Sequence, residues 1–280
     1  MDRIGVRICT VAALGCAAVA THGCGDAEKP AAPSAGERLD LGVVGVSARI
    51  GEHEVLGSGF VIDGDRGLVV TAAHSVWGAR SLRLSTGLGV LLGRIVARAP
   101  CDDLALLELH PRIPGLAALP TAPEGATGDQ LLRSIGRRHD APGAELASIP
   151  VRTTSAPLAS SAELPLPTAG IPLDSPLVPE ISGGPVVDQA GRLVGMAEAM
   201  GAPGAAAPAV AVPWARIRER LDQLRPGPRR IFVGWAQQYR CVGRQHAYAR
   251  EMHPGYRAAD ARLDAPVAPT RLAGTEGMDG

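Results

Sequence analysis

Three short stretches of the sequence carry the residue types that nucleophilic acyl transfer requires, namely a hydroxyl, a base and an acid. "SGGPVV" begins with Ser182, which is followed by two glycines and a proline. "VVTAAHSV" places His74 after an apolar run and two alanines, and "CDDLALLEL" places Asp103 at the head of another apolar run. A histidine that is oriented by a carboxylate can accept the proton of a serine hydroxyl as the serine attacks a carbonyl. The three residues therefore predict a nucleophile, a general base and an orienting acid.

Each of these residues also has a plainer interpretation. His74 could be a histidine at a strand end, and Ser182 a turn serine in a degenerate site. Asp102 competes with Asp103, which is favoured because it directly precedes the apolar run. Other histidines show no metal-ligand spacing, so we expect surface positions for them and no metal site. These histidines are His53, His110, His139, His246 and His253.

The segments that must position these residues have the pattern of β-strands. From Leu41 onward, short apolar runs rich in Val and Leu alternate with glycine-containing turns, which predicts the strands of a barrel or sandwich. "VPWARIRERLDQL", residues 212–224, is predicted as a helix because its apolar residues recur at helical spacing. Pro213 suits the first turn of that helix. Hydrophobic residues make up 46% of the chain and aromatic residues 3%, so the core must be aliphatic.

The first 24 residues predict an export signal. A short basic start is followed by an apolar run over residues 8–20, which is too short to span a bilayer. The run ends in "THGC", and this ending resembles a bacterial lipoprotein signal in which Cys24 becomes the lipidated first residue. Cys16 is a competing lipidation site, and an ordinary cleaved signal peptide is the plainer alternative. Residues 25–40, rich in Pro and Ala, are predicted to be a disordered tether that leaves the protein membrane-anchored and facing the periplasm or cell exterior.

The three motifs in this order resemble a trypsin-like serine protease of the HtrA type over residues 41–224. The resemblance implies an all-β fold, in which two six-stranded-type antiparallel β-barrels are followed by a closing C-terminal helix. It also implies His74 as the general base, Asp103 as its orienting acid and Ser182 as the nucleophile. The backbone N–H groups of Glu180 and Ser182 would form the oxyanion hole. The specificity pocket would be lined by Ala197, Glu198 and Ala199.

One position departs from the family pattern. Where such proteases carry "GNSGG", this chain has "EISGG", with Glu180 at the position of the first glycine. The N–H of that residue must turn into the oxyanion hole, and a residue with a Cβ carries roughly 1–3 kcal/mol of strain in such a conformation. Glu180 is therefore expected to slow the enzyme, or to let the hole form only on substrate binding.

Residues 225–280 form a C-terminal extension that is too short, and too poor in strand patterning, for a complete PDZ module. "WAQQYRCVGRQHAYAREMH" within it has the composition of a helix. Cys241 in this stretch and Cys101 are the two cysteines that remain beyond the predicted anchor. A disulfide between them and two unpaired cysteines are both compatible with their spacing.

These features predict an exported serine endopeptidase that acts on protein or peptide substrates and needs no cofactor. The net charge is zero, which gives no reason to expect a nucleic-acid partner. Two alternatives remain open. One is a catalytically inactive protease-fold binding or scaffold lipoprotein, and the other is a narrow-specificity processing enzyme whose tail selects the substrate. Proteases of the HtrA type are often trimers, but no residues here identify such an interface, so the oligomeric state is not predicted.

Overall fold

A computed structural model describes residues 33–123, 129–137, 145–154, 170–199, 209–224 and 235–258. The expected signal peptide over residues 1–24 lies outside the described residues, so export and lipidation at Cys24 stay predictions. Within the part of the chain that the structure describes, no helix is long and apolar enough to cross a membrane.

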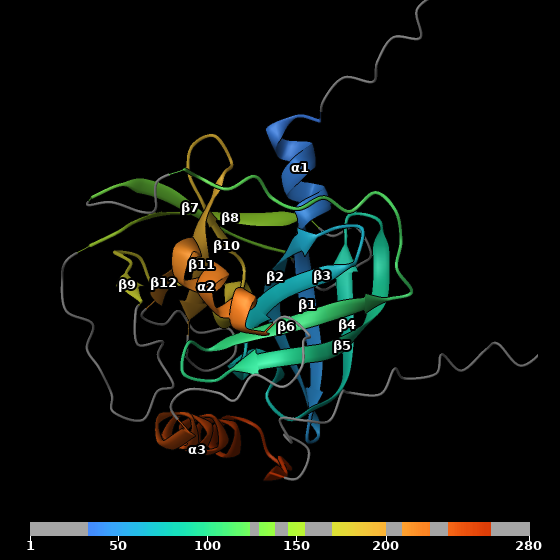
Figure 1. Ribbon diagram of the computed structural model, residues 1–280, viewed down its shortest axis with the longest axis vertical. Helices are drawn as coiled ribbons and strands as arrows, with labels where there is room; N and C mark the ends of the chain where they lie inside the picture. The colour runs from blue at the N-terminus through green and yellow to red at the C-terminus, as the bar shows by residue number, and fades with distance from the viewer. Residues whose placement is uncertain are drawn as a thin grey trace, which may run out of the picture. The chain divides into compact units, whose positions relative to one another are not determined.

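The first six strands close into an antiparallel barrel, in the order β1-β2-β3-β6-β5-β4 (Figure 1). The barrel closes because β1 pairs with β2 along one edge and with β4 along the other. Its strands are β1 (Val43–Ile50), β2 (His53–Asp63), β3 (Leu68–Ala72), β4 (Ala79–Thr86), β5 (Gly89–Ala99) and β6 (Leu104–His110). The first predicted barrel is thereby confirmed.

The second six strands form a curled antiparallel sheet, in the order β8-β7-β10-β11-β12-β9. Its two edge strands do not pair as a regular ladder, but Thr153 and Leu173 form an isolated antiparallel bridge just beyond them. A backbone hydrogen bond from Thr154 N–H to Pro172 O, at 2.9 Å, also joins these edge strands. The strands are β7 (Leu131–Arg137), β8 (Leu146–Arg152), β9 (Ile171–Pro172), β10 (Pro185–Val187), β11 (Leu193–Ala199) and β12 (Ala209–Pro213). The predicted chymotrypsin-like double-barrel class is confirmed, with an irregular seam in the second half.

A short helix occupies the end of the predicted tether. α1 (Ala35–Gly42) begins at a capping box, in which the Ser34 side chain accepts from Glu37 N–H and the Glu37 side chain accepts from Ser34 N–H. Its Asp40 accepts from the buried guanidinium of Arg137 at 2.7 Å. Residues 35–40 are therefore ordered and tied to the second sheet, which the absence of sequence periodicity did not indicate.

The predicted closing helix is α2 (Trp214–Leu224), which contacts β11, β12 and β5 and so touches both halves of the fold. The sequence predicts Pro213 in its first turn, whereas β12 ends at Pro213 and the helix begins at the next residue. Ile217 and Leu221 are buried, as the helical spacing predicts. The suspected helix in the C-terminal extension is also present, as α3 (Trp235–Met252).

The core is aliphatic, as the composition predicts, and consists of three clusters. One cluster fills the interior of the first barrel, and another is formed by side chains of the second, curled sheet. The third lies between them and contains residues from both halves, among them Phe60, Leu104, Ile135, Met196 and Val212. Burial of these side chains at about 25 cal/mol per Å² holds the two halves together and thereby fixes the residues at their junction.

Candidate active site

His74 begins the 3₁₀ turn η1 (His74–Val76), directly after β3, and is buried. Its backbone N–H donates to Asp103 Oδ1 at 2.8 Å, and its ring Nδ1 lies 2.5 Å from Asp103 Oδ2. Because an ionised carboxylate can only accept, this contact assigns the ring proton to Nδ1 and leaves the lone pair on Nε2. A neutral imidazole in this tautomer is ready to act as a base at Nε2.

Asp103 reaches His74 through an unusual backbone conformation. Its φ is +48°, and among the described residues it is the one non-glycine residue with positive φ. Aspartate tolerates this region better than most residues do. Its backbone carbonyl also accepts from Ala73 N–H at 2.8 Å. The turn before β6 is thus bonded to the turn after β3 at three points, and these points set the position of the carboxylate.

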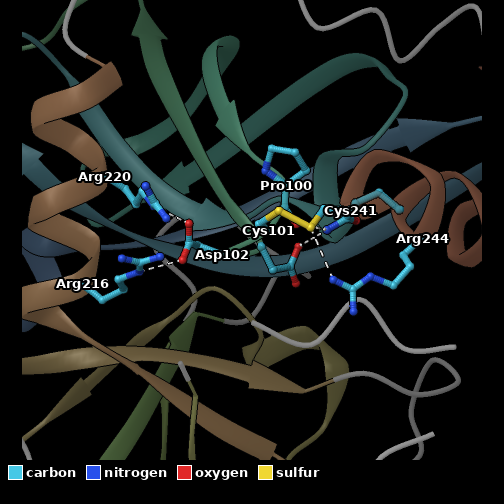
Figure 2. Close-up of a disulfide and its surroundings, with 9 residues drawn as sticks. Pro100, Cys101, Asp102, Arg216, Arg220, Cys241 and Arg244 are labelled. Atoms are coloured by element: carbon cyan, nitrogen blue, oxygen red, sulfur yellow. Dashed lines mark hydrogen bonds and ion pairs between the residues drawn. A yellow bond between two sulfur atoms is a disulfide. The ribbon is translucent and has the colours of Figure 1, made fainter. Parts of the chain in front are cut away.

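Asp102, the alternative acid, forms ion pairs with helix α2 rather than with His74. Figure 2 shows it facing Arg216 and Arg220 of α2, whose Nε atoms lie 2.8 Å and 2.5 Å from its two carboxylate oxygens. Its side chain is buried, and its charge is paired with the two guanidinium groups. The structure therefore brings Asp103 to His74 and uses Asp102 to attach α2 to the first barrel.

Ser182 lies in the turn between the 3₁₀ helix η2 (Pro179–Ile181) and β10 and is fully buried. Gly183 follows it at a φ of +84°, and a Cβ there would lie 2.4 Å from Ser58 O. Ser182 Oγ accepts from Ala199 N–H at 3.0 Å and donates to Glu198 Oε2 at 3.4 Å. Within the described residues no hydrogen bond joins Ser182 to His74.

Glu198 is the residue that links the two sides of the site. Its Oε2 lies 3.5 Å from His74 Nδ1 and 3.4 Å from Ser182 Oγ. Burial raises the pKa of the Glu198 carboxyl well above its usual range, and the charge of Asp103 and a hydrogen bond with it raise the pKa further. Burial therefore favours the protonated, neutral form of the Glu198 carboxyl.

Ligand atoms of His74, Asp103 and Glu198 all lie within 4.8 Å of one another, a spacing that invites comparison with a metal site. Two ligands of one tetrahedral zinc ion stand about 3.3 Å apart, given bond lengths near 2.0 Å. The 2.5 Å contact between His74 Nδ1 and Asp103 Oδ2 is shorter than that. The cluster therefore fits hydrogen bonding rather than metal coordination.

The oxyanion hole that the sequence predicts is not formed in this structure. Ser182 N–H, one of its two donors, is bonded to Pro179 O at 2.9 Å within η2. Glu180, the source of the other donor, belongs to η2, has no positive φ, and accepts from Ser58 Oγ through its carbonyl at 2.8 Å. The strain expected at Glu180 is thus absent in this conformation of the turn, because Glu180 has no positive φ.

The predicted pocket residues are divided between two environments. Ala197 and Ala199 are buried in the core of the second sheet, whereas Glu198 faces His74 and Ser182. A separate hollow of about 140 Å³ lies beside His74, and Leu56 and Glu180 contribute to its wall. The pocket for the residue before the scissile bond stays a prediction, because residues 200–208 beside Ala199 lie outside the described residues.

The C-terminal extension covers the acid side of the site, which the sequence did not indicate. Gln245 Nε2 donates to Asp103 Oδ1 at 2.8 Å, and the Tyr248 ring packs edge-on against His74 at a centroid distance of 5.5 Å. Cys241 forms a disulfide with Cys101, so the open question of their pairing is answered by a bond (Figure 2). The i, i+4 and i+7 spacing of these α3 residues could have shown a common helix face, although not what that face contacts.

Two histidines of the extension are not the surface residues that we expected. His253 is buried next to Tyr248, and burial lowers its pKa to about 4. His246 is half-buried against Trp77, whose indole N–H donates to its Nδ1 at 3.4 Å. Both belong to the packing of the extension against the first barrel. His53 and His110 are exposed, as predicted, and His139 lies outside the described residues.

Comparison with solved structures gives the same fold. The Rv3671c protease from M. tuberculosis, in its active form, matches with a TM-score of 0.55 and 22% identity, covering 69% of this chain and 84% of that one. The HtrA-type protease AlgW, solved with a tripeptide, matches with a TM-score of 0.55 and 20% identity, over 69% of this chain and 64% of that one. A serine endoprotease from Yersinia pestis matches with a TM-score of 0.54 and 18% identity, over 69% and 67%.

No curated protein matches the chain by sequence. A family model does: the trypsin-like peptidase domain matches residues 57–196, which is half of the chain and includes all three predicted catalytic residues. With the double-barrel architecture already described, this match assigns the family. The chain belongs to the trypsin-like peptidases.

Proposed function

We propose that this protein is an exported serine endopeptidase that hydrolyses peptide bonds in other proteins through an acyl-enzyme. His74 is the general base, Asp103 its orienting acid and Ser182 the nucleophile. The observation that carries the proposal is the two-point contact between Asp103 and His74, at the backbone N–H and at ring Nδ1. This contact fixes both the tautomer and the orientation of the imidazole, which a histidine with a purely structural role does not need.

The reaction proceeds in two halves. Ser182 Oγ attacks the substrate carbonyl while its proton passes to His74 Nε2, and the negative charge collects on the carbonyl oxygen. His74 then donates that proton to the leaving amine, and the acyl group stays on Ser182. Water repeats the sequence and releases the acid. Asp103 accepts from His74 Nδ1 and stabilises the imidazolium that forms twice.

The Ser182 turn must rearrange before this chemistry begins. Ser182 Oγ must rotate from Glu198 to His74 Nε2, and Ser182 N–H must leave Pro179 O. Turning over the peptide between Pro179 and Glu180 achieves the second change and aims Glu180 N–H into the same space, because the C=O and N–H of one peptide point in opposite directions. The rotation takes Glu180 toward positive φ, at roughly 1–3 kcal/mol. Substrate binding must supply that free energy.

A second candidate function is a protease-fold binding protein. The hydrogen bonds that engage both Ser182 Oγ and Ser182 N–H in this structure favour it, since neither group is available for catalysis as it stands. The same bonds are expected of an enzyme without substrate, in which catalytic contacts tighten only in the complex. The two functions differ in whether the turn can open.

Labelling with a fluorophosphonate tests the proposed function on the purified full-length protein. We expect wild type to be labelled and to cleave an unfolded protein substrate, and Ser182→Ala to lose both. Ser148→Ala, at an exposed position on β8, is the matched control and should behave as wild type. Labelling that persists in Ser182→Ala would contradict the assignment. If neither wild type nor folded Glu180→Gly is labelled, the result would favour the binding protein.

Export and anchoring are part of the proposal and rest on the sequence alone. We expect radiolabelled palmitate to be incorporated at Cys24, with the mature chain beginning at that residue. Cys24→Ser should abolish incorporation, and Cys16→Ser should leave it unchanged. The opposite pattern would move the anchor to Cys16, and no incorporation in wild type would remove the anchor.

A further inference from the structure

The catalytic carboxylate receives a hydrogen bond from a part of the chain outside the matched family domain. Asp103 Oδ1 accepts from two donors, His74 N–H and Gln245 Nε2, each at 2.8 Å. Gln245 belongs to α3, in the C-terminal extension, and is fully buried. The bond therefore joins the proposed active site to a segment 142 residues further along the chain.

The direction of the Gln245 amide follows from its partners. Nε2 also lies 3.5 Å from Pro100 O, so both neighbours of this end are acceptors and the nitrogen must face them. The other end, Oε1, is buried and has no partner within the described residues. An unpaired buried acceptor costs free energy, so the bond to Asp103 is the interaction that explains a glutamine at this position.

Contacts of α3 with the first barrel fix the position of Gln245 relative to Asp103. Figure 2 shows the disulfide that joins Cys241 to Cys101. Cys241 lies one helical turn before Gln245, and Cys101 lies two residues before Asp103. Tyr248, one turn after Gln245, packs edge-on against the His74 ring. Beyond the helix, Glu52 N–H donates to Pro254 O at 3.3 Å. The helix is therefore fixed to the first barrel before, at and after Gln245.

We propose that Gln245 is a positioning residue of the active site, which holds the carboxylate of Asp103 in the orientation that His74 requires. α3 is then a working part of the site rather than an appendage to the protease domain. This inference rests on the proposed function, because the residue can be tested as a positioning residue only in a protein whose serine reacts.

The chemical reason lies in the crowding of acidic groups at this position. Glu198 Oε2 lies 3.5 Å from His74 Nδ1, so a second carboxyl group stands beside the Asp103 carboxylate that must stabilise the His74 imidazolium. A neutral donor on Asp103 stabilises the charged form on that residue. It also opposes rotation of the carboxylate away from His74 Nδ1. Without Gln245 the Asp103 carboxylate would lose a donor that holds it, and Glu198, at 3.5 Å from the ring nitrogen against 2.5 Å for Asp103, is too distant to replace its contact.

The test compares the rate of fluorophosphonate labelling of Ser182 in three full-length variants. Gln245→Leu removes the donor at similar volume, and we expect its rate to fall about 10- to 100-fold, as for the loss of a hydrogen bond to a charged group. Arg250→Ala, at an exposed position of α3, is the control and should match wild type. If only the Glu180→Gly form is labelled, the same variants are compared in that background.

Gln245→Glu, the third variant, gives a signature that a merely structural role would not produce. The introduced carboxyl group can donate the same bond when it is protonated, whereas its ionised form repels Asp103, so the rate relative to wild type should fall as pH rises. The titratable groups facing this position are His74, Asp103, Glu198, Tyr248 and His253. They are present in both proteins, so they largely cancel in the ratio. Melting temperatures identify any variant that fails to fold, and Gln245→Glu keeps the test decisive if Gln245→Leu does.

The outcomes separate this inference from the proposed function. If wild type is labelled, and Gln245→Leu reacts as fast or the Gln245→Glu ratio is independent of pH, the inference is wrong and the peptidase stands. If neither wild type nor Glu180→Gly is labelled, the proposed function is wrong. This inference, which rests on the proposed function, is then wrong as well.

Discussion

The two halves of the candidate site are in different states. On the side of the first barrel, His74 and Asp103 already have the contacts that catalysis requires, and Gln245 adds a third donor to the carboxylate. On the side of the second sheet, Ser182 has both of its useful groups engaged elsewhere, Oγ by Ala199 N–H and N–H by Pro179 O. One half is preorganised and the other is closed.

The difference follows from how each half is constructed. The acid and base are fixed by paired strands, by the bond between Ala73 N–H and Asp103 O, and by a disulfide next to the acid. Ser182 follows a single 3₁₀ turn, and short 3₁₀ turns have poorer hydrogen-bond geometry than α-helices. Such a turn can be remodelled at the cost of a few bonds. Control of this peptidase is therefore expected to lie in the Ser182 turn and not in the acid–base pair.

The largest effect should come from breaking the preorganised half. Asp103→Asn places an amide against His74 Nδ1, favours the wrong tautomer, and should lower kcat/KM for peptide cleavage by about 10⁴-fold. Asp102→Asn is the matched control, because it changes the neighbouring acid in the same way but loses only the contacts to α2. It should lower the melting temperature and leave kcat/KM near the wild-type value. Equal losses in the two variants would contradict the assignment of Asp103.

A smaller effect, and an increase, should come from opening the closed half. Glu180→Gly removes the Cβ at the residue that must reach positive φ, and should raise the labelling rate of Ser182 by roughly 5- to 150-fold, the equivalent of about 1–3 kcal/mol. Glu180→Ala removes the carboxylate but keeps the Cβ. If alanine accelerates labelling as much as glycine does, the negative charge and not the backbone limits the reaction.

The smallest effect concerns the residue between the halves, and it appears in stability. Because the pKa of buried Glu198 is raised on folding, the folded chain holds a proton that the unfolded chain releases above about pH 4.5. The contribution of Glu198 to the free energy of unfolding should therefore decrease as pH rises above that value, by at most about 1.4 kcal/mol per pH unit. Glu198→Gln has no such proton. Its free energy of unfolding, relative to wild type, should increase with pH, and a constant difference would show that Glu198 is ionised in the folded protein.

Much of the fold could be predicted from local sequence, and so could the segments that carry the candidate residues. The Val- and Leu-rich runs with glycine turns predict strands because each strand is a continuous stretch of chain. "SGGP" alone is a weak signal for a nucleophile, and it predicts Ser182 only together with the His74 and Asp103 motifs before it. The structure adds that Gly183 has a positive φ and no room for a Cβ. The likeness to HtrA-type proteases then supplied the pairing of barrels.

The rest depended on contacts between distant segments. Glu198 lies in "GMAEAM", which as a strand does not show whether the side chain faces solvent or the two catalytic groups. Gln245 and Tyr248 share a helix face, but the amphipathic pattern does not say which surface that face covers. The closed state of the Ser182 turn, in which Ser182 N–H is bonded to Pro179 O, depends on the orientation of the peptide between Pro179 and Glu180. The sequence is compatible with either orientation of that peptide.

A crystal structure of the protein with Ser182 phosphonylated tests the central claim most directly. The account predicts that the phosphonyl oxygen accepts from the N–H groups of Ser182 and Glu180, that Pro179 O has turned away, and that the contact of His74 with Asp103 is unchanged. A phosphonylated Ser182 whose N–H is still bonded to Pro179 O would contradict it, as would an acid–base pair that rearranges while the turn stays closed.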